Sequence, residues 1–142
     1  MAPPKKWGKH GWKFMHYVAL SYPENPTIDD KILYYDFFNN FGKVLPCGKC
    51  KNNFKDHLKK YPLTNEVLSS RNNLVKWTID MHNIVNYYTG KKMLTYQEAL
   101  NEIYKDDDNN CKLNWIHWII FGLAIIMIVL VIYYFYRKNN NR

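Results

Sequence analysis

A stretch of 22 residues near the C-terminus, 115–136, contains no Asp, Glu, Lys or Arg, and it limits how the whole chain can fold. As a helix it would rise about 33 Å, which is enough to cross the hydrocarbon core of a membrane. Aromatic residues, which favour the membrane interface, cluster at its two ends: Trp115, Trp118, Tyr133, Tyr134 and Tyr136. A helix this apolar on all faces would be unusual as the core of so small a protein. We therefore predict a transmembrane helix at 115–136, preceded by one folded domain.

The residues around this span bear on its orientation. The N-terminus lacks the apolar run of a secretory signal, so a single C-terminal span predicts a tail anchor. Arg137, Lys138 and Arg142 follow the span, whereas residues 106–108 before it are all Asp. Counting basic residues favours a cytosolic tail, which conflicts with simple tail anchoring. The side of the membrane that the domain occupies therefore stays open.

The residues before the span carry an excess of positive charge. Three of the 20 Lys/Arg follow the span, so residues 1–114 hold 17 of them with all 12 Asp/Glu, a net charge of +5. Such an excess could favour nucleic acid or acidic lipid. The lysines are spread along the sequence, however, and no nucleic-acid-binding motif accompanies them. We interpret them as solvated helix faces and expect no nucleic-acid partner.

Apolar residues before the span recur at helical spacing, and no run alternates with the period of two that a half-buried strand requires. The predicted helices are 7–21, 28–43, about 47–60, 71–89 and 96–104. Expected capping residues are Thr27 or Asp29, Gly90, and Thr95 with Glu98. The pattern predicts an all-α fold, a four-helix bundle with a short fifth helix. The domain would comprise 1–104, followed by a polar linker at 105–114, the span, and a short basic tail at 137–142.

Two cysteines, Cys47 and Cys50, stand two residues apart in a chain with only one other cysteine, Cys111. They could provide two of the four ligands of a zinc ion, with His57 nearby, but a second pair is missing. As a purely structural disulfide, they would close too short a loop to add much stability. They could also exchange electrons, although a thioredoxin fold is disfavoured because the chain lacks the strands that it needs.

Electron exchange has a physical basis in the position of this pair. A Cys-x-x-Cys at the start of a helix places its first sulfur near unpaired backbone N–H groups and the positive end of the helix dipole. Both favour the thiolate that attacks disulfides, and Lys49 and Lys51 act in the same direction. We expect an accessible Cys47 that exchanges with a partner, and an enclosed Cys50 that faces the bundle interior.

A disulfide passes electrons to oxygen only through a cofactor, and two groups of residues could bind one. The first recurs at every fourth position of the first helix: Gly8, Trp12 and His16. The second lies in the fourth helix: His82, Asn83 and Asn86. Buried polar side chains without partners are unfavourable, and a planar polar ligand inside the bundle would satisfy them. The alternative is that Trp12 belongs to the core and His16 bonds a backbone carbonyl.

Three segments, in this order and spacing, resemble the Erv/ALR-type FAD-linked sulfhydryl (thiol) oxidases: "WGKHGWKFMH" (7–16), "LPCGKCKNNF" (45–54) and "HNIVNYYTGK" (82–91). The short, disulfide-poor layout is similar to the versions encoded by large cytoplasmic DNA viruses. The resemblance covers about residues 5–104. It implies an FAD-binding helical bundle that oxidises protein dithiols and passes electrons to O2, giving H2O2.

The resemblance also implies roles for individual residues. Cys47 and Cys50 would form the redox-active disulfide, with Cys50 next to the flavin and Cys47 exchanging with the substrate. The residues implied to bind FAD are Gly8, Lys9, Trp12, His16, His82, Asn83, Val85, Asn86 and Lys91. No metal site is implied. Members are commonly homodimers through this bundle, which predicts the same here.

The sequence departs from the family pattern in three ways. Asn53 stands where members often have His, and the second, structural disulfide of many cellular members has no counterpart. The additional Cys-x-x-Cys that shuttles electrons in cellular members is also absent. We expect a separate, thioredoxin-like carrier to deliver electrons to Cys47, and for Cys111 either a link between subunits or no role.

The preferred interpretation is a membrane-anchored oxidase in a host cytoplasmic or a virion membrane. It would form disulfides where the host keeps thiols reduced, a route that cytoplasmic viruses use. The rival interpretation is a non-enzymatic membrane adaptor whose basic helical domain binds a partner. Its Cys-x-x-Cys would be structural, vestigial or bound to zinc.

Overall fold

A computed structural model of the chain describes residues 2–140, apart from the side chains of 106–115. Within this range every element of secondary structure is a helix, and there are no strands. The residues divide into two compact units, one up to Leu100 and one from Asn101 onward. Each unit is described by itself below.

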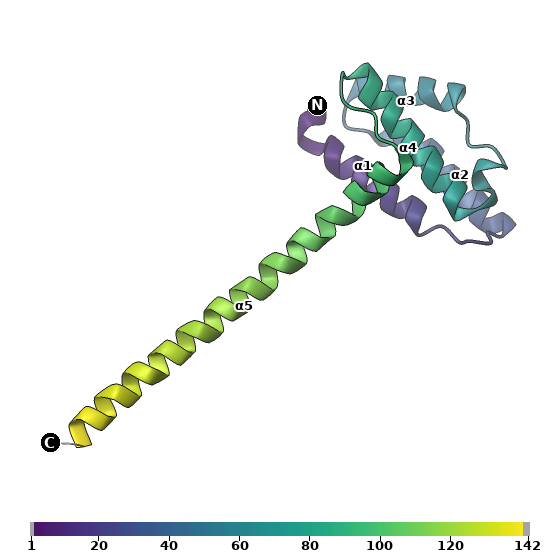
Figure 1. Cartoon of the computed structure of the whole chain (residues 1–142). Helices are drawn as coiled ribbons and strands as arrows, with labels where there is room; N and C mark the ends of the chain where they lie inside the picture. The colour runs from purple at the N-terminus through teal and green to yellow at the C-terminus, as the bar shows by residue number, and fades with distance from the viewer. Residues whose placement is uncertain (1, 141–142) are drawn as a thin grey trace. The chain divides into compact units, whose positions relative to one another are not determined.

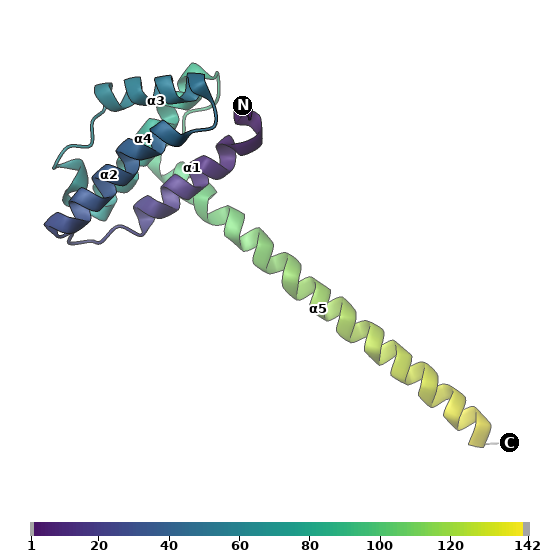
Figure 2. The same cartoon turned by 180° about the vertical axis from the view of Figure 1, so that it is seen from behind.

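Helices of the first unit form the predicted bundle (Figure 1). They are α1 (Pro4–Leu20), α2 (Ile28–Val44), α3 (Gly48–Lys60) and α4 (Arg71–Tyr88), with a short 3-10 turn, η1 (Val67–Ser69), before α4. Helix α1 packs on α4 and α2 packs on α3, as the two opposite views show (Figure 2). The all-α class predicted from the sequence is confirmed.

Side chains at the helix ends explain why the helices begin and stop where they do. Thr27 accepts a hydrogen bond from the N–H of Asp30, whose carboxylate accepts from the N–H of Thr27, so Thr27 is the N-cap of α2. Ser70 caps α4 through the N–H of Asn73. Gly90 follows α4 with a φ of 68°, a left-handed conformation that glycine adopts without strain.

The core of the bundle lies between α1, α2 and α4. Met15, Phe38 and Leu74 are fully buried, and the ring of Phe38 meets Trp77 edge-on at 5.4 Å between centroids. Tyr22, which the sequence places in the break after the first helix, is also fully buried, and its hydroxyl donates to the carbonyl of Leu68 at 2.9 Å. Burial of this tyrosine holds the α1–α2 connection against η1.

Helix α2 buries only part of the face that its apolar spacing favours. Helical spacing from 28 to 43 puts four apolar residues on one side, Ile32, Tyr35, Phe38 and Phe41, yet the side chains of Ile32 and Tyr35 are 55% and 45% exposed. Tyr34 and Phe37 pack against the core instead, together with Phe38 and Phe41. The helix has apolar residues on more than one side, so the spacing alone permits more than one buried face.

Helix α5 (Tyr96–Asn140) is one continuous helix of 45 residues. The predicted short helix, linker and span all lie on it, because no Gly or Pro occurs between 105 and 114 to stop a helix. Its section Ile116–Asn140 is long and apolar enough to cross a membrane, and its most apolar window of 18 residues has a mean hydropathy of 2.7. Cys111 and Trp115 lie outside the described side chains.

The two glycines Gly42 and Gly8 give a test of this packing. A Cβ on Gly42 would collide with the ring of Phe54, whereas a Cβ on Gly8 would meet no atom within 4 Å. We expect Gly42→Ala to lower the free energy of unfolding by about 1–3 kcal/mol, because overpacking outweighs helix propensity. Gly8→Ala should instead raise it by about 0.5–1 kcal/mol.

Chemical denaturation followed by far-UV circular dichroism measures both variants. A Gly42→Ala protein as stable as the wild type would show that α2 and α3 do not approach as closely as described.

Candidate functional site

The two cysteines of the Cys-x-x-Cys motif form a disulfide at the start of α3, with 5.1 Å between their Cα atoms. Cys47 is the N-cap residue, and its Sγ accepts a hydrogen bond from the N–H of Cys50 at 3.2 Å. The predicted helix start is thus confirmed. Both residues are half-buried, and Cys50 packs against the hydrophobic core. When the disulfide is reduced, the same N–H groups and the helix dipole favour a thiolate at Cys47.

A cavity of about 360 Å³ lies against this disulfide. Its wall combines Gly8 and Trp12 from α1, Cys47 and Cys50 from α3, and Val85 from α4. These residues come from the three segments that the sequence analysis singled out. The fold therefore brings the Cys-x-x-Cys motif together with the first and third of the quoted segments.

The size and lining of this cavity suit a small planar ligand. Its volume falls within the range of about 300–1,000 Å³ that is usual for small-molecule sites. The space beside Gly8 is open, since a Cβ there would meet nothing within 4 Å, and the indole of Trp12 provides a planar wall. A planar ring bound here would lie beside Trp12 and the Cys47–Cys50 disulfide, which belong to the same lining.

Behind Trp12, two histidines and a threonine form a buried hydrogen-bonded chain between α1 and α4. His16 Nδ1 lies 3.2 Å from Thr78 Oγ1, and His16 Nε2 lies 3.1 Å from His82 Nδ1. The hydroxyl of Thr78 donates to the carbonyl of Val75 at 2.8 Å. His82 also stacks on Trp12, with 4.4 Å between ring centroids and planes 8° apart.

These hydrogen bonds determine which nitrogens of His16 and His82 carry protons. Because Thr78 uses its single proton on Val75, it must accept a hydrogen bond from His16 Nδ1–H. A neutral His16 then has a bare Nε2, which accepts from His82 Nδ1–H. His82 Nε2 is left as a hydrogen-bond acceptor.

Burial keeps both rings neutral. It lowers the pKa of His16 to about 4. It also lowers the pKa of His82 to about 3, with smaller contributions from His16 and Lys91.

Comparison with known proteins places this arrangement in a family. Residues 9–105 match the Erv1 / Alr family. The chain belongs to this family.

Relatives and solved structures agree with the family match. The chain is 69% identical over 102 residues to a probable FAD-linked sulfhydryl oxidase of Acanthamoeba polyphaga mimivirus, covering 72% of this chain and 71% of the relative. An FAD-linked sulfhydryl oxidase of African swine fever virus is 30% identical over 95 residues, 67% of this chain and 77% of the relative. The crystal structure of the FAD binding domain of Erv1 from Saccharomyces cerevisiae superposes with a TM-score of 0.66 and 27% identity, covering 75% of this chain and 97% of that one.

The remaining residues expected to bind FAD lie outside the cavity wall of this Erv1/Alr family member. Lys9 and Lys91 are exposed, whereas Asn86 is buried and its carbonyl accepts from the N–H of Lys91 at 2.8 Å. His16 and His82 support the wall from behind, through Trp12. The contacts of these five residues with a cofactor stay a prediction.

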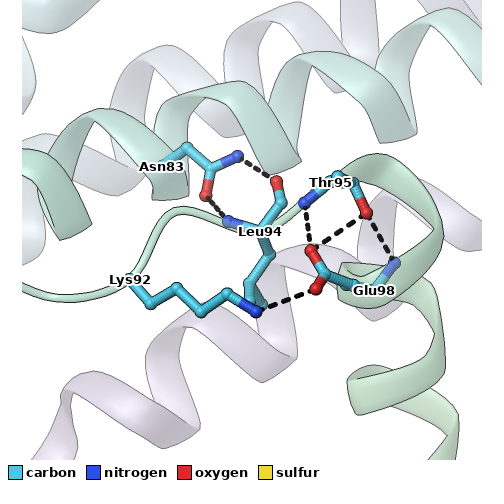
Figure 3. A network of polar contacts seen from close by, with 5 residues as sticks. All are labelled: Asn83, Lys92, Leu94, Thr95 and Glu98. Atoms are coloured by element: carbon cyan, nitrogen blue, oxygen red, sulfur yellow. Dashed lines mark hydrogen bonds and ion pairs between the residues drawn. The ribbon is translucent and has the colours of Figure 1, made fainter.

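Asn83 is engaged in a different contact (Figure 3). Its carboxamide accepts from the N–H of Leu94 at 2.9 Å and donates to the carbonyl of Leu94 at 2.8 Å, which ties the segment after α4 to that helix. Glu98 then caps the next helix through Thr95, and its bond with Lys92, together with those to Thr95, lowers the pKa of Glu98 to about 2. A cofactor contact of Asn83 stays a prediction, and its observed role is to hold this segment.

Several residues near the site were not singled out from the sequence. Thr78 precedes His82 by four residues, so it shares a helix face with His82 and Asn86, and this spacing could have identified it. Further cavity residues of the same kind are Trp7, Gly11, Met15 and Thr89. The ring of His57, considered above as a zinc ligand, stacks on Tyr88 at 5.7 Å. Among the side chains that the structure describes, no three His, Cys, Asp or Glu could hold a metal ion together.

The neutral histidine pair predicts a loss of stability in mild acid. The pKa values of His16 and His82 in the folded protein lie below their ordinary value of 6.5. Between about pH 6.5 and pH 4 the unfolded chain therefore binds more protons, so the free energy of unfolding falls as the pH drops through this window. Between pH 7 and pH 5, we expect the free energy of unfolding of His82→Gln to fall by about 1–2 kcal/mol less than that of the wild type.

Urea unfolding at the two pH values measures this difference. His10→Gln, on the exposed side of the same bundle, is the matched control and should follow the wild type. If the free energy of unfolding fell equally in the wild type, His82→Gln and His10→Gln, this would contradict a neutral buried pair.

The open space beside Gly8 predicts opposite effects on stability and on flavin content. A larger side chain there would enter the cavity, so Gly8→Leu should lower the FAD retained through purification to a small fraction of the wild-type amount. The apoprotein should become more stable by about 0.8–1 kcal/mol, because leucine is the better helix former. Visible absorbance per protein and thermal unfolding measure the two effects. Gly8→Ala should keep its flavin, and full occupancy in Gly8→Leu would place the ring elsewhere.

Proposed function

We propose that this chain is an FAD-linked sulfhydryl oxidase that forms disulfides in protein dithiols. The observation that carries the proposal is the position of the Cys47–Cys50 disulfide in the wall of a cavity that suits a flat ring. The viral relatives are named FAD-linked sulfhydryl oxidases, which supports the same activity here. The reaction converts one dithiol and one O2 into one disulfide and one H2O2.

The cysteines perform the exchange with substrate. A substrate thiolate attacks Cys47 Sγ, the Cys47–Cys50 bond breaks, and Cys50 leaves as a thiolate. The second substrate thiol, as its thiolate, then attacks the substrate sulfur of the mixed disulfide and releases Cys47. Two electrons have passed from the substrate to the cysteine pair, and the two protons that the substrate thiols lose on ionisation are released to water. Cys47 suits the first attack because it caps α3, and Cys50 suits the inner role because it packs on the core.

The residues around the cavity would hold the cofactor and exclude water. When bound there, FAD would supply the two-electron chemistry that links the reduced cysteine pair to O2. Trp12, supported by the stacked His82, holds one flat wall, and Gly8 leaves room for a ring against the backbone. The bare Nε2 of His82 offers a hydrogen-bond acceptor to a ligand group. The other residues that we propose to contact FAD are Lys9, His16, Asn83, Val85, Asn86 and Lys91.

We also propose that the apolar part of α5 anchors the enzyme in a lipid membrane, either host cytoplasmic or virion. Length, composition and exposed apolar side chains support this from Ile116 to Asn140. A homodimer is supported by the exposed apolar side chains of α1 and α2, among them Phe14, Ile32 and Leu33. A thioredoxin-like carrier would deliver electrons to Cys47, since the sequence has no second Cys-x-x-Cys.

Replacing one cysteine tests the proposed activity. Cys50→Ser should abolish O2 consumption with dithiothreitol while FAD remains bound, because Cys50 carries the inner transfer. Its Cys47 should also accumulate mixed disulfides with substrate proteins, which mass spectrometry detects. Cys111→Ser is the matched control and should keep wild-type turnover of the small dithiol. Undiminished turnover in Cys50→Ser would refute the proposed roles.

A further inference from the structure

A second hollow, of about 500 Å³, lies between α2 and α3. Lysines line it, with Lys43 from the last turn of α2 and three from α3: Lys51, Lys55 and Lys59. Apolar residues line it as well, among them Leu58 and Leu63. We call this hollow the lysine groove.

The lysine groove collects charge that is dispersed in the sequence. Lys51, Lys55 and Lys59 recur at every fourth position, so they share one face of α3, and all three are exposed. Among the described residues that line the groove, none is acidic. The nearest acidic partner with a defined contact is Asp56, whose carboxylate lies 3.7 Å from Lys59 Nζ at the exposed surface. An exposed ion pair of this kind does little to reduce the positive potential of the groove.

The lysine groove adjoins the redox disulfide. Phe54 lines both the groove and the cavity that contains Cys47 and Cys50, and Lys51 directly follows Cys50. A polypeptide lying in the groove would therefore have neighbouring residues within reach of the start of α3. The groove thus lies next to the redox site, and its lysines have no part in the proposed electron transfer.

We propose that the lysine groove docks an acidic segment of the protein dithiol substrate; this inference rests on the sulfhydryl oxidase function proposed above. Lysines on successive turns of a helix are about 5.4 Å apart, and carboxylates on one side of an extended segment are about 6.8 Å apart, a difference that flexible lysine side chains accommodate. The hollow with apolar residues between the charges suits a polypeptide that carries both kinds of side chain. A flat lipid surface or a nucleic-acid backbone would use the charges but leave this apolar hollow without a partner.

The experiment compares three substrates of the full-length, FAD-loaded protein in detergent by O2 consumption. They are dithiothreitol, a Cys-x-x-Cys peptide flanked by glutamates, and the same peptide flanked by glutamines. The wild type should have the higher kcat/KM for the glutamate peptide, through a lower KM, and the preference should shrink at high salt. Lys55→Glu/Lys59→Glu should lower kcat/KM for the glutamate peptide by about five- to tenfold and leave dithiothreitol turnover unchanged.

Three further variants sharpen the comparison. Lys59→Glu and Lys60→Glu make the same charge change at adjacent positions, but only Lys59 lines the groove, so only its variant should reduce the preference for the glutamate peptide. Lys55→Gln/Lys59→Gln removes the two positive charges without reversing them. It should therefore also reduce the preference for the glutamate peptide, but by less than Lys55→Glu/Lys59→Glu does.

The outcomes separate this proposal from the function on which it rests. If the protein oxidises none of the three substrates, the oxidase function fails. If it oxidises dithiothreitol but treats both peptides alike, or if Lys60→Glu matches Lys59→Glu, only the docking proposal is overturned. Retained peptide preference in Lys55→Glu/Lys59→Glu, with weakened binding of single-stranded RNA, would overturn it in favour of a nucleic-acid surface.

Discussion

The buried hydrogen bond between His16 and Thr78 is the contact on which the arrangement of the site depends. It joins α1 to α4 inside the bundle, and the bond from His16 to His82 and the stacking of His82 on Trp12 continue it to the cavity. A polar pair in an apolar core must keep its partners, because an unpaired buried group is unfavourable. The register of α1 against α4 is therefore specified by more than apolar packing, which many registers would satisfy. The planar wall at Trp12 and the neutral state of both histidines follow from that register.

Helix α3 separates two tasks on its two sides. Its first turn holds the disulfide against the cavity. The backbone N–H groups at the start of the helix favour a thiolate there when the disulfide is reduced. Its outer face carries Lys51, Lys55 and Lys59 beside α2. Phe54 belongs to both surroundings and packs closely against Gly42 of α2, so the two sides are mechanically connected by one buried ring.

Local features of the chain could be predicted because they act over a few residues. The start of α2 at Thr27, the end of α4 before Gly90 and the cap at Thr95 each depend on neighbours within one turn. Features that depend on distant segments were predicted less well. Ile32 and Tyr35 are exposed because the apolar residues of α2 occupy more than one side, and Tyr22 lies in a connection as expected but is buried there, where its hydroxyl donates to the carbonyl of Leu68. The pairing of the Asn83 carboxamide with Leu94 is a contact that no helical spacing encodes, while a cofactor contact of Asn83 stays a prediction.

The sequence alone determined the helices of the bundle, the Cys-x-x-Cys at a helix start and the long apolar stretch near the C-terminus. These are consequences of side-chain periodicity, capping and length, which are written in consecutive residues. Only the tertiary structure decided that Gly8, Trp12, Val85 and the disulfide share one cavity, and that scattered lysines of two helices border one groove. Which helix faces meet depends on the packing of residues far apart in the chain, and that packing is a property of the whole core.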